Sequence, residues 1–130
     1  MRLGRTIHYL GIAIQYKYTG SYEMAKLIKM AGYTTDEIVE NMMNALEEAM
    51  PEYTDWYFGW HWRNDPKKGI LYFGLPHDIM YSLFADYEAF ESFWKKIIQK
   101  ALPKLDFTKK ELEYWHPPIV SFEDTEWEED

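Results

Sequence analysis

The sequence predicts an α+β fold: a strand, two helices, a three-stranded meander and a last helix, with the helices packed on one face of a small antiparallel sheet. Residues 36–50 and 86–101 carry apolar side chains at helical spacing, each behind a residue suited to cap a helix. Residues 6–18 and 53–63 alternate instead with the period of a half-buried strand. The chain has 130 residues, 47% of them apolar, so it can bury one core without a metal or a disulfide.

The first strand is expected from Thr6 to Tyr18, where β-branched and aromatic residues are frequent and Ile12 and Ile14 share one face. A turn follows, and Ser21 is placed to cap a short helix. Gly32 stands directly after that helix, where a left-handed backbone conformation commonly ends one. The N-terminal part is therefore predicted to form a strand, a turn and a short helix.

The second helix is expected from Asp36 to Met50. Thr34 and Glu37 have the spacing of a capping box, in which each side chain accepts a hydrogen bond from the backbone N–H of the other residue. Pro51 cannot continue a helix, so it marks the end.

A β-hairpin is expected next. Residues 53–63 alternate, with Trp60 and Trp62 on one face, and a loop of turn-forming residues joins them to the apolar stretch 70–75. Whether this aromatic face belongs to the core or forms an exposed platform stays open. Residues from Ile79 to Phe84 suit either a third strand of the meander or the start of the last helix, and we favour the strand.

The last helix is expected to begin at Asp86, whose side chain can cap it, and to end before Pro103. Acidic residues near its start and lysines near its end complement the helix dipole. Residues 107–115 are expected to add one more helical turn. The apolar stripes of the two capped helices form the predicted core: Ile38, Met42, Leu46, Phe90, Trp94 and Ile97.

The charges are placed unevenly. The chain has 14 basic and 22 acidic residues, a formal net charge of −8 at pH 7, and six of the acids lie in the last ten residues. We therefore divide the chain into one domain at 1–118 and an acidic, aromatic tail at 119–130. Within the domain, residues 31–62 contain seven acids and no Lys or Arg, whereas residues 95–110 contain six bases and one acid. These blocks can pair within the chain, pair between subunits or face separate partners.

No pattern in the sequence identifies a catalytic or metal site. Without cysteine, the chain cannot form disulfides, thiolate nucleophiles or cysteine-ligated metal centres. Its histidines lack metal-ligand spacing, and no glycine-rich phosphate loop or serine-nucleophile motif is present. His77 and Asp78 could form half of a site with a distant residue, although an exposed turn histidine is the simpler interpretation. We expect a protein that is not an enzyme and holds no metal or cofactor.

Direct nucleic-acid binding is also not expected. Trp60 and Trp62 flank a histidine, as in surfaces that stack single-stranded bases, but such surfaces need cations nearby and the preceding stretch is acidic. A helix-turn-helix at residues 21–42 would present an acidic second helix to the DNA major groove, which would repel it.

The sequence therefore favours a small acidic protein-binding module, an antagonist or inhibitor of a basic, nucleic-acid-handling protein. Small inhibitors of the anti-defence or immunity type have this size and charge. Carboxylates would steer the association and exposed rings would anchor it. The expected partner-binding residues come from the second helix, the hairpin and the tail: Asp36, Glu37, Glu40, Glu47, Trp60, Trp62, Glu123, Asp124, Glu126, Trp127 and Glu128.

Two alternatives stay open. A structural or assembly subunit, such as a viral particle component, would form a homo-oligomer through its two charge blocks. An enzyme or small-ligand binder would line a pocket with Trp60, His61, Trp62 and His77. The sequence shows no signal peptide or membrane segment, so we expect a cytoplasmic protein, compatible with a viral origin, that has no membrane partner.

Overall fold

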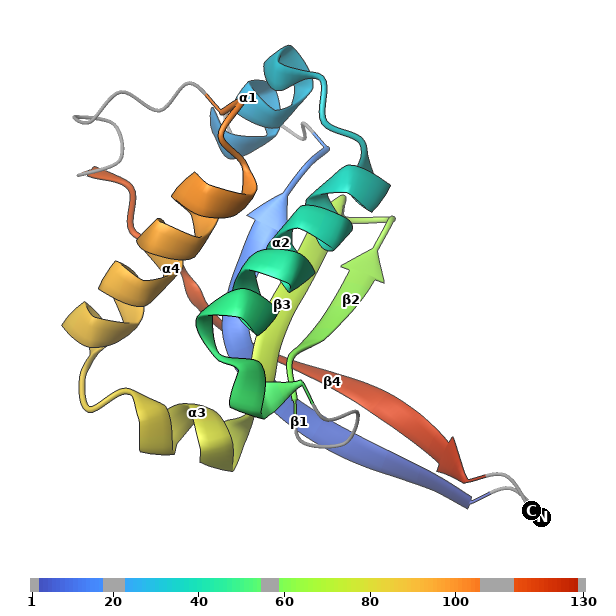
Figure 1. Ribbon diagram of the computed structural model, residues 1–130. Coiled ribbons are helices and arrows are strands. Elements are labelled where there is room, and N and C mark those ends of the chain that lie inside the picture. The colour runs from blue at the N-terminus through green and yellow to red at the C-terminus, as the bar shows by residue number, and fades with distance from the viewer. Residues whose placement is uncertain (1–2, 18–22, 55–58, 106–113, 129–130) are drawn as a thin grey trace.

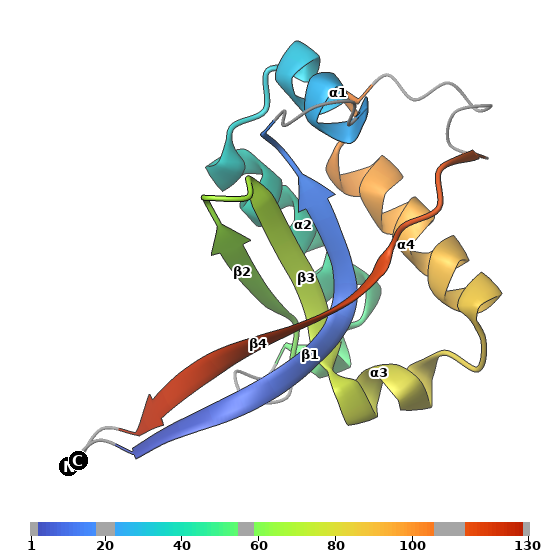
Figure 2. The same ribbon diagram turned by 180° about the vertical axis from the view of Figure 1, so that it is seen from behind.

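The computed structural model describes residues 3–17, 23–54, 59–105 and 114–128, and in them the chain has an α+β fold. Four α-helices accompany a curled, four-stranded antiparallel sheet with the strand order β2-β3-β1-β4. Helices α2 and α4 cover one face of the sheet (Figure 1), and from behind the strands lie in front of the helices, with β4 beside β1 (Figure 2). The elements in chain order are β1 (Leu3–Gln15), α1 (Glu23–Ala31), α2 (Thr35–Ala49), a 3-10 helix (Pro51–Tyr53), β2 (His61–Asp65), β3 (Ile70–Pro76), α3 (His77–Leu83), α4 (Tyr87–Ala101) and β4 (Ile119–Glu128).

The central strand β1 has two partners. On one side it pairs with β3, from Tyr9 opposite Pro76 to Gln15 opposite Ile70. On the other side it pairs with β4, from Leu3 opposite Glu128 to Ile12 opposite Ile119. The predicted hairpin is confirmed as β2 and β3, although β2 begins only at His61.

The capped helices are confirmed. The N–H of Glu37 donates to Thr34 Oγ1 at 3.2 Å at the start of α2, and the N–H of Ala89 donates to Asp86 Oδ1 at 2.9 Å at the start of α4. Gly32 follows α1 with a φ of 75°, as its predicted role requires. The expected cap at residue 21, and most of the extra helical turn expected at 107–115, lie outside the described residues.

The predicted core is also confirmed. Every apolar position expected there from α2 and α4 is buried, and Trp94 has no exposed surface. Strands β1 and β3 add Ile12, Ile14 and Phe73 to the same cluster. The core therefore lies between the helices and one face of the sheet, as amphipathic helices on a sheet require.

The third strand expected at residues 79–84 is wrong, because residues 77–83 form helix α3. Strand β3 ends at Pro76, which is also the residue that precedes α3 as its N-cap. After it, Ile79, Met80 and Leu83 recur at helical spacing, and Met80 is buried. A short apolar run fits both the period of a strand and the period of a helix, and here the chain forms a helix directly after Pro76.

The C-terminal segment is where the topology differs most from expectation. Residues 119–128, expected as an acidic tail, form the edge strand β4, so the fourth strand of the sheet comes from the end of the chain. Backbone pairing to β1 does not require an apolar side-chain period, which is why an acidic segment can form it. Phe122 adds burial, since its ring stacks on Tyr9 at 5.2 Å.

A second aromatic cluster lies on the face of the sheet away from the helices. The ring of Tyr9 stacks on His61 at 4.4 Å, and Phe122 lies 5.4 Å from Tyr72. Nearby, Gly11 stands opposite Gly74, and a Cβ on either glycine would collide with backbone atoms of the neighbouring strand. The two strands thus approach one another more closely than side chains would allow.

Within the described part of the chain, none of the helices combines the length and apolar character needed to cross a membrane.

Candidate functional site

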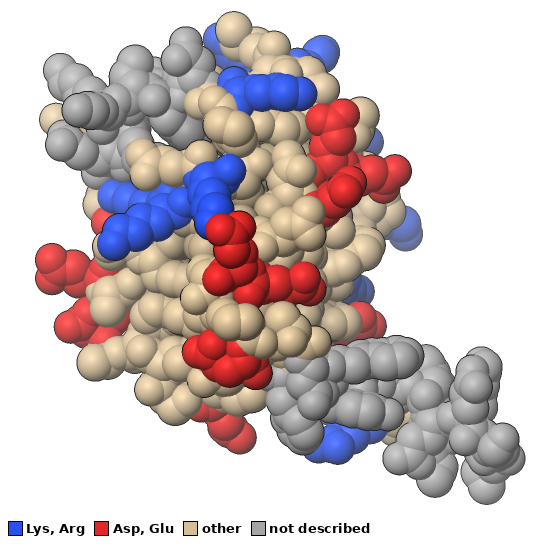
Figure 3. Space-filling model, in the orientation of Figure 1, with Lys and Arg blue, Asp and Glu red and all other residues tan. Residues whose placement is uncertain are grey.

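The acids of α2 point to two sides of the helix. Glu48 Oε1 lies 2.7 Å from Lys100 Nζ, at the end of α4, and Glu37 Oε2 lies 3.7 Å from Lys104 Nζ, just beyond it. Lys and Arg atoms accordingly lie against Asp and Glu atoms on this face of the molecule (Figure 3). Two acids of the acidic block therefore pair with two lysines of the basic block within one chain.

The other three acids of α2 form what we call the acidic stripe: Asp36, Glu40 and Glu47. At about 100° per residue, these positions fall within roughly 40° of one another around the helix, and about 60° or more from Glu37 and Glu48. All three are exposed, and among the described residues none has a hydrogen bond or an ion pair. The stripe is thus a set of carboxylates that the described part of the chain does not neutralise.

The two hairpin tryptophans do not share an exposed face. Trp60 precedes β2 and is 7% exposed, with its ring stacked on Phe93 at 5.8 Å and meeting Trp94 edge-on at 5.7 Å. Trp62 lies on the edge strand and is 41% exposed. Trp60 is therefore a core residue, and only Trp62 can contact a partner.

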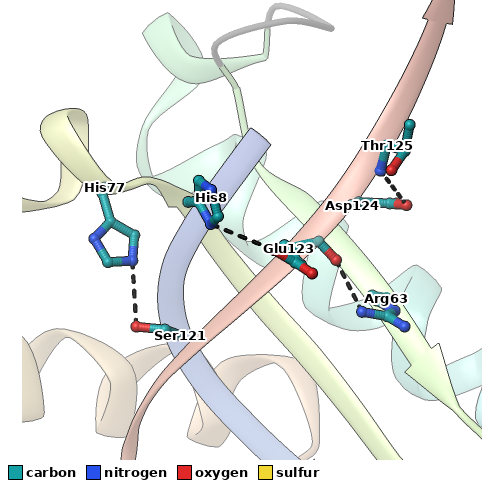
Figure 4. A network of polar contacts seen from close by, with 7 residues as sticks. All are labelled: His8, Arg63, His77, Ser121, Glu123, Asp124 and Thr125. Carbon is teal, nitrogen blue, oxygen red and sulfur yellow. Dashed lines mark hydrogen bonds and ion pairs between the residues drawn. The ribbon is translucent and has the colours of Figure 1, made fainter. Parts of the chain in front are cut away.

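The acids of β4 that the structure describes are bound within the chain. His61 Nε2 lies 2.8 Å from Asp124 Oδ2, and His8 Nδ1 lies 3.6 Å from Glu123 Oε2. The side chain of Arg63 donates to the carbonyl oxygen of Glu123 at 2.9 Å (Figure 4). Side chains of the edge strand β2 thus contact the opposite edge strand β4, and these contacts stabilise the curled shape of the sheet.

The remaining predicted residues of the tail belong to the same strand. In the ladder, Glu126 stands opposite Arg5, Trp127 opposite Gly4 and Glu128 opposite Leu3. Their backbone is therefore part of the sheet. The acidic stripe lies on α2, which covers one face of the sheet, whereas these residues lie on the edge strand β4 (Figures 1 and 2).

A third histidine–carboxylate pair ties the start of the C-terminal segment to α4. His116 Nδ1 lies 2.7 Å from Glu91 Oε2, and Lys95 Nζ lies 2.9 Å from Glu91 Oε1. The hydrogen bonds from His116 and Lys95 lower the pKa of Glu91 to about 2. Burial, aided by the nearby Glu91 carboxylate, raises the pKa of Tyr87. This cluster holds the chain ahead of β4 in place.

The described residues also line a cleft of about 680 Å³ between β1 and α3, which we call the β1–α3 cleft. One wall is β1 from Arg5 to His8, and the other is the chain from Pro76 to Ile79. His77 and Ser121 both line the cleft, and Ser121 Oγ lies 3.2 Å from His77 Nε2 (Figure 4). Sequence reasoning did not find this cleft, because it forms only when Pro76 ends β3 and β4 pairs with β1.

The Ser121–His77 contact alone does not make a nucleophilic site. Such a site needs a group that orients the second ring nitrogen of the histidine, and the described residues place none there. The pocket considered from the sequence is not assembled either, since Trp60 lies in the core, His61 binds Asp124 and His77 faces the cleft. Among the described residues, no three His, Asp or Glu side chains lie together in a way that could hold a metal ion.

Comparison of the chain with protein-family models, with curated proteins and with solved structures found no match.

Proposed function

We propose that this protein is a small, non-enzymatic binding module that recognises a basic protein through the acidic stripe of α2. One observation carries the proposal: three exposed carboxylates share one side of a helix and have no cation within the described chain, whereas the other two acids of that helix are paired. Unpaired charges of one sign raise the encounter rate with an oppositely charged partner and fix the orientation of the complex.

An antagonist role follows from the same chemistry. A nucleic-acid-handling protein presents Lys and Arg to phosphates, and carboxylates aligned on a helix can occupy those cations instead. Trp62, which is 41% exposed, supplies an aromatic side chain of the type that anchors interfaces. Glu123 and Asp124 bind histidines of their own chain, so we assign them only a secondary, long-range contribution.

The pairing of Lys100 and Lys104 with α2 favours this proposal over an assembly subunit that joins acidic and basic blocks of different copies. Two of the basic side chains that such an assembly would use, Lys100 and Lys104, already face acids of the same chain. Exposed ion pairs of this kind contribute little to stability, about 0–1 kcal/mol, but they do neutralise the surface between the two helices.

The test compares three forms of the protein as bait in an extract of the source organism. These are the wild type, a stripe variant (Asp36→Asn, Glu40→Gln, Glu47→Gln) and a matched control (Glu37→Gln, Glu48→Gln) that neutralises the paired acids of the same helix. We expect the wild type and the control to retain the same basic protein, and the stripe variant to lose it. With the purified partner, the association rate should fall steeply as salt rises, and at least tenfold in the stripe variant.

Two results would contradict the proposal. One is capture by the stripe variant at wild-type yield. The other is a retained partner whose association rate does not respond to salt. If the partner binds nucleic acid, the antagonist role further requires that this protein displaces an oligonucleotide from it in a competition assay.

A further inference from the structure

Part of the central strand has a partner on one side only. β1 pairs with β4 from Leu3 to Ile12, but with β3 only from Tyr9 onward, because β3 ends at Pro76 and the chain turns into α3. Among the described residues, the β3 side of Leu3–His8 therefore has no strand beside it. We call this stretch the free edge of β1.

The free edge belongs to a ribbon that projects from the body. The N-terminal half of β1 and the end of β4 run together away from the helices, and the described residues place no third strand beside them (Figures 1 and 2). A two-stranded ribbon is only marginally stable in water by itself, and a third strand or a covering element is normally needed. The ribbon would thus gain stability from a strand added at this edge.

The backbone direction shows which residues could bind an added strand. Along β1, N–H and C=O groups point alternately to the two sides. The N–H of Tyr16 donates to the Gly69 carbonyl on the β3 side, and the Glu123 carbonyl, opposite His8, accepts from Arg63. Both observations show that the backbone N–H and C=O groups of the even-numbered residues of β1 point toward the β3 side. Gly4, Thr6 and His8 therefore present their backbone groups at the free edge.

The space beside this edge is already open. It is the β1–α3 cleft, whose volume of about 680 Å³ lies directly against residues 5–8. His77 and Ser121, whose side chains lie 3.2 Å apart, also line this cleft. An extended segment added to a sheet edge beside a helix is a common mode of protein recognition.

We propose that the free edge of β1 pairs antiparallel with the free edge of a second copy of this chain. Because even-numbered residues must face even-numbered ones, the symmetric arrangement that uses the edge most fully places Thr6 opposite Thr6 of the second copy. Gly4 then stands opposite His8, and Arg5 opposite Ile7. No like charges meet, so the edge is complementary to itself.

The other edge of the ribbon cannot serve the same purpose. β4 carries four acids, and pairing two β4 strands would set acids against acids at about 5 Å, which is destabilising. Arg63 also occupies the Glu123 carbonyl on that edge. In the proposed dimer the two β4 strands are separated by both β1 strands, about 14 Å in all, which exceeds the screening length of about 8 Å at physiological salt.

The first test measures mass in solution by light scattering and by sedimentation, from low to high protein concentration. The Thr6→Pro variant removes an N–H from the free edge and leaves the ladder with β4 intact, and Thr6→Ala is the matched control. We expect the wild type and Thr6→Ala to form dimers, and the dissociation constant of Thr6→Pro to rise at least tenfold. Circular dichroism checks that each variant is folded.

The second test uses the absence of cysteine from the chain. Residues directly opposite in a hydrogen-bonded antiparallel pair have Cα atoms about 5.5 Å apart, within the range of a disulfide. A Thr6→Cys variant should therefore form an interchain disulfide under mild oxidation. Thr125→Cys, opposite Thr6 but on β4, should form much less.

Several results would overturn the proposal. These are a wild type that stays monomeric at the highest concentration, a folded Thr6→Pro variant that dimerises like the wild type, or equal cross-linking of the two cysteine variants. A dimer that dissociates as salt is raised would also contradict it, because the pairing depends on backbone hydrogen bonds and added salt only screens the repulsion between two acidic chains. The stripe variant of α2 should dimerise like the wild type, so this test is independent of the proposed function.

Discussion

Trp94 is the bulkiest side chain with no exposed surface, and it packs on the rings of Trp60 and Phe90. Its indole N–H has no hydrogen-bond partner among the described residues. We expect Trp94→Ala to lower the free energy of unfolding by about 3–5 kcal/mol, because it leaves a large cavity. Trp94→Phe should cost clearly less, since it keeps an aromatic ring and removes the unpaired donor. Urea titrations of both variants check this, and equal losses would contradict the packing described for the ring.

Gly11 is constrained by space and not by backbone conformation. A Cβ there would collide with the Phe73 carbonyl on the neighbouring strand. Gly11→Ala should lower the free energy of unfolding by about 1–3 kcal/mol through overpacking. Gly32→Asn is a useful comparison, since Gly32 has a φ of 75° with open space around it and asparagine tolerates that conformation. If Gly32→Asn lowers the melting temperature more than Gly11→Ala does, Gly11 is not constrained by space as described.

At the scale of elements, the helices were predictable because local signals agree. Thr34 and Asp86 cap helices whose apolar stripes reach the core, and each signal lies within a few residues of the next. The strand β4 was not predictable in this way, because its partner is more than a hundred residues earlier and its side chains are largely acidic. Helix α3 was not predicted, because a run as short as residues 79–84 fits both the helical period and the strand period.

The pairing of β4 changes what its removal should do. From the sequence, deletion of residues 123–130 is expected to leave the fold intact. In the structure it removes the partners of Leu3–His8 and the Asp124 contact with His61. We therefore expect the truncated chain to melt several degrees lower, whereas Glu123→Gln with Glu126→Gln, which keeps the strand, should melt close to the wild type. Identical melting of the truncated and full-length chains would show that this part of the ribbon adds nothing to stability.

The Glu91 cluster predicts a pH dependence. The pKa of Glu91 is about 2 in the folded chain, against an ordinary value of 4.5. A carboxyl whose pKa is lowered by folding stabilises the fold above its unfolded value, and that contribution is lost as the pH falls through the folded value. We expect the wild type to be more stable than Glu91→Gln at pH 5, and the difference to shrink between about pH 4.5 and 2. Urea titrations across this range measure it, and a constant difference would be inconsistent with the described contacts.

At the scale of the whole molecule, charge should keep the protein away from nucleic acid. The net charge is −8, and Arg63, Lys100 and Lys104 already bind groups of the same chain. We expect no appreciable binding of a single-stranded oligonucleotide at ~150 mM salt by fluorescence anisotropy, because such binding needs several free cations. Sub-micromolar affinity would contradict this expectation.

The candidate surfaces were predictable only in part. That Asp36, Glu40 and Glu47 share one side of a helix follows from their spacing alone. That Glu37 and Glu48 are neutralised by Lys104 and Lys100 does not, because it depends on how α2 packs beside α4. The β1–α3 cleft depends on three segments that meet only in the folded chain.

The sheet's topology also bears on how the chain reaches its native state. The first strand in the chain is the central one, yet its partners are the third strand and the last, with Leu3 opposite Glu128. Such non-local pairing is slow, because the loop-closure entropy is lost before the contacts form. During synthesis, α1, α2 and α4 can collapse on β1 and β3 early, while β1 keeps one whole side unpaired until the last strand emerges. Folding therefore ends where the chain is most open to pairing with another molecule, and late intermediates are the species most prone to aggregate.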